Sequence, residues 1–229
     1  MEHKHKNIFI DELIIHWKFT IGSVVIASLI IAGYKFMLTE HTEINTSLLF
    51  EGFFTAHLLF ASVTPASLIS RYMKAFIPGI MVAIISSLLT CTLSDIIFPY
   101  LGAVLLGYEM HLHICIIEEP LISAIFILSG AFCGYILSSK IVRLSKYTHM
   151  FHIILSAVAA GLYLITYGAG EITLKSVLFI PVIAVSVLTP CILNDIAVPV
   201  YFITKNLRSD NERKNQLDRI HSEHHDHHH

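Results

Sequence analysis

A nine-residue motif that carries a cysteine, an aspartate and a proline at fixed spacing occurs twice in the chain. It reads CTLSDIIFP from Cys91 and CILNDIAVP from Cys191, 100 residues later. Each copy lies late in a long apolar run, where a carboxylate is costly to bury, and ionisable residues at membrane depth are usually functional. The repetition therefore predicts one site that Asp95 and Asp195 build from the two halves of the chain.

The residue types in this motif suit a divalent metal ion. Residues four apart share one face of a helix, so each cysteine should lie beside the aspartate of its own copy. Thiolate and carboxylate ligands together favour zinc or a neighbouring first-row metal. A cation also relieves the repulsion between two buried carboxylates, and protons can exchange for it. We expect Asp95, Asp195, Cys91 and Cys191 to bind the ion. The alternative for each cysteine is core packing as a small apolar residue.

Neighbouring polar residues extend this predicted site. Ser94 and Asn194 precede the aspartates and offer neutral oxygens. His57 lies inside another apolar segment, where histidine often serves as a ligand or proton relay. We include His57 in the site, with a satisfied interior histidine as the alternative. His152 occupies the corresponding segment of the second half near its cytoplasmic start, and we interpret it as an interfacial residue.

The loop before residue 121 predicts a second, outer metal site. His111, His113 and Cys115 alternate as they would on one face of a strand, and Glu118 follows them. Such a loop would collect cations at the extracytoplasmic mouth. The spacing matches no standard closed zinc site, and an ordinary acidic loop is the alternative.

Histidines also gather in both tails, at His3 and His5 and in the tract from His221 to His229. Histidine-rich tracts bind transition metals, so a native tract would buffer or sense a metal in the cytoplasm. The competing interpretation of the C-terminal tract is an expression tag.

The composition indicates an integral membrane protein. Of 229 residues, 55% are hydrophobic and only 14% are charged, and the mean hydropathy is +0.69. A soluble domain of this composition would have too little polar surface. The sequence has no glycine-rich nucleotide loop, and its basic residues gather at segment ends, so nucleic acid is not expected as a partner.

Six apolar segments are long enough to cross a bilayer, which takes about 20 residues each. The third and sixth are too long, because 31 residues of helix extend roughly 46 Å. We expect these two helices to be kinked or broken at Pro99 and Pro199, which act as hinges. The predicted segments are 19–38, 48–69, 76–106, 121–139, 150–167 and 174–204.

Lysine and arginine alternate between the connecting loops, which predicts the orientation in the membrane. Basic residues flank the N-terminus, the loops near residues 71–74 and 140–146, and the C-terminal end, while the other loops are mainly acidic. Basic loops stay in the cytoplasm. Both termini should therefore be cytoplasmic, in a protein of the plasma or inner membrane.

The two halves match beyond the motif, which predicts an inverted repeat. Phe76-Ile-Pro recurs at Phe179-Ile-Pro, and residues of the first segment recur in the fourth at an offset of 101. Three helices per unit place the second unit upside down in the membrane, as in many secondary transporters. We predict an all-α integral membrane protein with a cytoplasmic tail (1–18), a three-helix repeat (19–106), an extracytoplasmic loop (107–120), a second three-helix repeat (121–204) and a cytoplasmic tail (205–229).

These features favour a small secondary transporter or channel for a divalent metal cation, and not an enzyme. One three-helix unit would rock against the other around the paired site. The expected cargo is zinc, nickel, cobalt or manganese, no resident cofactor is required, and the lipid bilayer is the other partner. The Gly-x-x-x-Gly at Gly130 and Gly134 predicts close helix packing, within one chain or across a homodimer. The alternatives are a transporter or substrate-binding subunit for an organic solute, an intramembrane metal-dependent hydrolase, and an assembly factor.

Overall fold

A computed structural model of the chain describes residues 17, 20–30, 45–72, 76–136, 138–169 and 177–205, and every regular element in that part is a helix. Three helical stretches are long and apolar enough to cross a membrane: Thr46–Tyr72, Phe76–Leu105 and Phe151–Gly168. This supports the predicted membrane class. Both histidine-rich tails lie outside the described residues.

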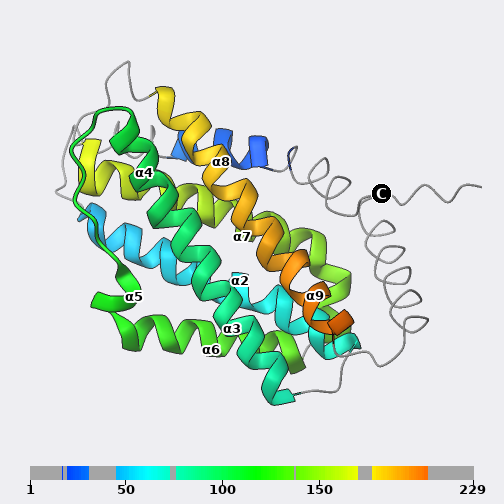
Figure 1. Cartoon of the computed structure of the whole chain (residues 1–229). Coiled ribbons are helices and arrows are strands. Elements are labelled where there is room, and N and C mark those ends of the chain that lie inside the picture. Colours follow the sequence, from blue (N-terminus) through cyan, green and yellow to red (C-terminus); the bar gives the residue numbers. More distant parts are fainter. Residues whose placement is uncertain are drawn as a thin grey trace, which may run out of the picture.

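Apart from the start of α7, the described helices lie close to the predicted segments (Figure 1). A short helical stretch, Thr20–Ile30, precedes them. The elements are α2 (Thr46–Tyr72), α3 (Phe76–Thr92), η1 (Leu93–Ile97), α4 (Phe98–Leu105), α5 (Cys115–Glu118), α6 (Pro120–Ile136), α7 (Ser138–Leu164), η2 (Ile165–Ala169), α8 (Phe179–Ile192), η4 (Leu193–Ala197) and α9 (Val198–Lys205).

Two helices form the centre of the bundle. In α2, and in Phe151–Gly168, which covers the end of α7 and most of η2, 61% of the most apolar 18-residue stretch is buried, compared with 33% for Phe76–Leu105. A helix that is apolar all round is typical of such a central position. The continuous run α3–η1–α4 crosses the bundle in the direction opposite to α8–η4–α9 (Figure 1). Side chains on α2 and α7 therefore meet side chains from both long outer helices.

The two long outer helices continue through π-helical turns instead of breaking. η1 and η4 each span five residues and begin with a leucine, two positions before the aspartate of the motif. The N–H of Phe98 donates to the carbonyl of Leu93, five residues back, and Pro99 opens α4. A π turn adds one residue to the helical turn, and such turns occur often at functional sites. The hinges predicted at the two prolines are thus wide turns in continuous helices.

Pro65 inside α2 explains a buried polar contact between three helices. Proline has no N–H, so the carbonyl of Ala61, four residues earlier, loses its donor within the helix. The hydroxyl of Ser87 on α3 donates to that carbonyl at 3.0 Å, and the amide of Asn194 on η4 donates to it at 2.8 Å. The carbonyl that Pro65 leaves without a helical donor therefore joins α2 to both long outer helices.

Close packing of α6 against α2 resolves the Gly-x-x-x-Gly prediction in favour of a contact within one chain. A Cβ atom added at Gly130 would lie 2.1 Å from the carbonyl oxygen of Leu59, and one at Gly134 would lie 2.4 Å from that of Val63. Only glycine permits this approach of two backbones. The hydroxyl of Ser62 also donates to the carbonyl of Ile127 at 3.0 Å across the same contact.

One predicted boundary is wrong. The basic stretch 140–146 was expected to be a loop, but α7 begins at Ser138, directly after the end of α6 at Ile136. Lysine and arginine are good helix formers, so a charged stretch can extend an apolar helix beyond the hydrophobic region. Because the basic residues belong to the helix itself, residues that follow them lie deeper in the bundle than residues next to a loop would.

Candidate metal centre

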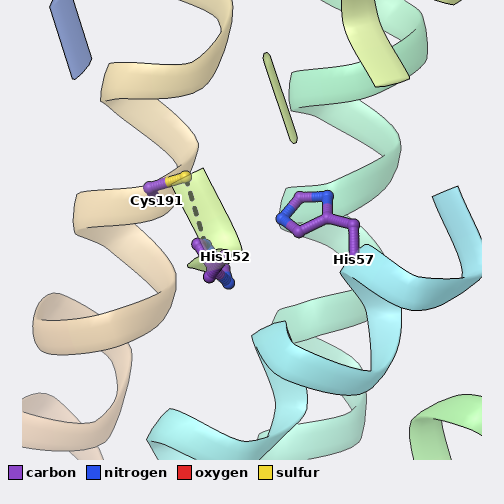
Figure 2. Close-up of side chains that lie close together, drawn as sticks. All are labelled: His57, His152 and Cys191. Carbon is purple, nitrogen blue, oxygen red and sulfur yellow. Dashed lines mark hydrogen bonds between the residues drawn. The ribbon is translucent and has the colours of Figure 1, made fainter. Parts of the chain in front are cut away.

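Three metal-binding side chains from three helices converge in the interior. His57 of α2, His152 of α7 and Cys191 of α8 place their ligand atoms within 4.8 Å of one another. Their exposed fractions are 1%, 1% and 3%. His152 lies between the other two, with its Nε2 3.2 Å from the Sγ of Cys191 and its ring 4.6 Å from the ring of His57, centre to centre (Figure 2). Two imidazoles and a thiol form a ligand set for zinc or a similar ion.

The carboxylate of Asp95 orients the imidazole of His57 through its Nδ1 atom. Its Oδ2 lies 2.5 Å from Nδ1 of His57, and the carboxylate is fully buried. Ser94 and Ser156 donate their hydroxyls to Oδ1 at 2.6 and 2.7 Å. A carboxylate that accepts the Nδ1 proton leaves the Nε2 lone pair of His57 available to an ion. Metal-binding histidines commonly carry such a carboxylate partner.

The spacing within the first motif copy places two groups on the same histidine. Cys91 lies one turn before Asp95, and its Sγ is 3.8 Å from Nε2 of His57 while Asp95 occupies Nδ1. The prediction that these two residues share one helix face is therefore confirmed. Asp95 was predicted to bind the ion directly. Its carboxylate contacts the ligand His57 and the hydroxyls of Ser94 and Ser156, and it is not part of the group of three convergent ligands.

The remaining residues of the predicted central site are used differently. The amide of Asn194 donates to the Ala61 carbonyl and accepts from the hydroxyl of Ser87 at 3.2 Å, so it satisfies the carbonyl that Pro65 leaves without a helical donor. The backbone of Asp195 lies in η4, but its side chain lies outside the described part of the chain.

Sequence reasoning missed two residues of this site. His152 was interpreted as interfacial, which is wrong: it is buried and contacts both other ligands. Because α7 starts at Ser138, His152 lies about 21 Å into the helix by the rise of 1.5 Å per residue. Ser156 follows one turn later on the same face and reaches Asp95. Their spacing of four in an apolar run was the available signal.

The outer loop brings two of its four predicted ligands, His113 and Glu118, into contact, but not the full set. His113 pairs with Glu118 at 2.8 Å and stacks on Tyr167, with ring centres 4.5 Å apart. His111 is exposed, and Cys115 is buried at the start of α5. Among the described residues, the group of His57, His152 and Cys191 is the one set of three or more metal-binding side chains that converge.

The environment of Cys115 also disfavours metal binding. Burial, together with the nearby carboxylates of Glu51 and Glu118, raises the pKa of its thiol to about 12. Since metals bind the thiolate, a thiol that stays protonated at neutral pH is a poor ligand. Cys91 and Cys191 lie beside histidines in the interior, whereas Cys115 lies near the carboxylates of Glu51 and Glu118.

An aromatic cluster lies between the outer loop and the metal centre. Phe50 lies two turns from His57 on the same face of α2, roughly 10 Å away along the axis. Its ring packs edge-on against Tyr163 and Tyr167, with centres 5.3 and 5.6 Å apart. Phe50 and Tyr163 are fully buried.

The arrangement as a whole suits reversible binding of a borderline metal cation. It combines neutral imidazole nitrogens, a thiol that deprotonates on binding, and a carboxylate that supplies negative charge without direct contact. Hydroxyls compensate that carboxylate when no cation is bound. Comparisons with protein families, curated proteins and solved structures find no match to this chain, so its function is inferred from the geometry of this site.

Proposed function

We propose that the chain is a small membrane transporter for a divalent transition-metal cation, which binds at His57, His152 and Cys191. The observation that carries this proposal is the convergence of these three ligands in the interior of the helix bundle, where Asp95 contacts His57. Polar groups inside a membrane are expensive and generally serve transport or catalysis. Binding would release the thiol proton of Cys191, so exchange of metal for protons is the expected form of coupling.

An inverted repeat of two three-helix units is the architecture that we propose for this site. Both central helices have 27 residues, and both outer helices carry a five-residue π turn followed by eight helical residues. The contact of His57 with Cys91 matches the contact of His152 with Cys191. The opposite directions of the two outer helices in Figure 1 agree with this symmetry. The metal would then bind where the two units meet, as substrates do in such transporters.

Six crossings with both termini in the cytoplasm complete the proposal. The aromatic cluster near the acidic loop would close the extracytoplasmic side in the described conformation. Transport requires a second conformation in which this cluster opens and the opposite side closes.

The two main alternatives gain less support from the contacts. A hydrolase built from His57, Asp95 and the outer-loop histidines would need these groups around one cavity, whereas His113 is engaged with Glu118 and Tyr167. A transporter for an organic solute does not require three metal-binding side chains at one point.

Flux into proteoliposomes tests the proposal. Purified full-length protein would be reconstituted with a metal-sensitive dye inside, and zinc, nickel, cobalt and manganese would be added outside. We expect flux for at least one of these ions, and a loss of 10-fold or more in Cys191→Ser and His152→Gln. Cys133→Ser is the matched control, because Cys133 is an exposed cysteine on α6. Absence of both metal binding and flux in a folded preparation would refute the proposal.

A further inference from the structure

We propose that Cys91 is a fourth ligand, so that each half of the chain supplies one histidine and one cysteine to a single ion. This inference rests on the proposed function and narrows the cargo to ions that favour a tetrahedral set of two thiolates and two imidazoles. Zinc fits this description best, and manganese fits it least.

The contacts of Cys91 support this assignment. Cys91 is 1% exposed, and its Sγ faces Nε2 of His57, the nitrogen that Asp95 leaves with a lone pair. In the other half, the Sγ of Cys191 faces Nε2 of His152. Each half therefore presents a sulfur and a nitrogen that are already neighbours, and the two pairs are joined by the contact of the two imidazole rings.

The sulfur–nitrogen distance within each pair fits two ligands of one tetrahedral metal ion. With metal–nitrogen and metal–sulfur bonds near 2.05 and 2.3 Å, a tetrahedral angle separates the two ligand atoms by about 3.6 Å. The observed separations are 3.8 Å for Cys91 and His57, and 3.2 Å for Cys191 and His152. Both values lie within about 0.4 Å of the expected separation.

Cys91 must approach the other half to complete the site. It is not among the three residues whose ligand atoms all lie within 4.8 Å of one another. It lies two residues before η1, and a π turn lets a helix change its local register at small cost. We infer that the ion first meets His57, His152 and Cys191, and that α3 then brings in Cys91. Each thiol gives up its proton as its sulfur–metal bond forms, and these protons leave to water.

Cobalt(II) as a spectroscopic substitute for zinc tests this inference in the purified full-length protein. Its sulfur-to-cobalt charge-transfer band scales with the number of bound thiolates, and its visible bands report tetrahedral geometry. Cys91→Ser and Cys191→Ser should each lower the charge-transfer band per bound cobalt by about half, since each leaves one thiolate of two. Cys133→Ser and Cys115→Ser are matched controls and should leave it unchanged.

The outcomes separate this inference from the proposed function. A Cys91→Ser spectrum equal to that of the wild type would overturn the role of Cys91 and leave the three-ligand site intact. Absence of any cobalt binding in the wild type would overturn both. If Cys91→Ser does not fold, X-ray absorption of the zinc-loaded wild type decides: two sulfur neighbours support the inference and one refutes it.

Discussion

Replacing Asp95 by asparagine is predicted to weaken metal binding without abolishing it, because the carboxylate acts through His57. In the wild type, Oδ2 accepts from Nδ1 of His57, while two serine hydroxyls donate to Oδ1. Asparagine has nearly the same shape but no charge, and its amide group carries a donor. If that donor faces Nδ1, the imidazole takes the tautomer with the proton on Nε2, where the metal must bind.

Loss of a partner that orients a metal ligand usually lowers affinity by about 10- to 100-fold. That range corresponds to about 1.4 to 2.7 kcal/mol. Loss of a direct ligand should lower affinity much further, so His57→Gln provides the reference for complete disruption. Ser156→Ala removes one of the two hydroxyl donors to Oδ1 and should have a smaller effect than Asp95→Asn.

Competition with a chelator of known zinc affinity measures all three variants in detergent at one pH. Two results would contradict the reasoning. Wild-type affinity in Asp95→Asn would show that the carboxylate does not orient His57. An affinity as low as that of His57→Gln would show that Asp95 binds the ion directly.

Three further predictions concern packing and reactivity. Gly134→Leu should lower the melting temperature, because a Cβ there meets a backbone carbonyl at 2.4 Å, at a cost of about 1–3 kcal/mol. Gly22→Ala is the control and should not lower the melting temperature, because a Cβ there meets nothing within 4 Å. Asn194→Ala should lower the melting temperature by removing one donor to the Ala61 carbonyl, worth about 1 kcal/mol, and leave the order of metal preference unchanged. Cys115 should react with maleimide at pH 8 about 1,000-fold more slowly in the folded than in the denatured protein, because a pKa raised from 9.0 to about 12 lowers the thiolate fraction by that factor. Its rate should rise with pH up to about 12, and equal rates in both states would contradict the burial of this thiol.

The sequence was sufficient to predict which residues of the first motif copy reach the site. Cys91 and Asp95 lie four positions apart, and this spacing places both on one histidine. Hydropathy located the three helices that are long and apolar enough to cross a membrane, because length and apolar content are properties of each segment alone. His57 was predicted because few polar residues occur inside such segments.

The rest depends on contacts between segments, which local patterns do not encode. His152 was missed because the start of α7 was placed at the end of the basic stretch, which the helix in fact includes. The role of Asn194 follows from a carbonyl on another helix that Pro65 leaves without a donor. The alternation in the outer loop predicted a shared face, but residues 108–114 form no regular strand and Cys115 begins a helix.

The glycine contact between α6 and α2 also constrains how the chain is assembled during synthesis. α2 is translated before α6, and one face of α2 contacts the backbone at Gly130 and Gly134. The carbonyl that accepts from Ser62 also belongs to the later helix. The N-terminal half consequently cannot reach its final packing by itself, because the partner of α2 lies in the other half. Fragments divided between the two halves are expected to regain metal binding only when both are inserted into the same membrane.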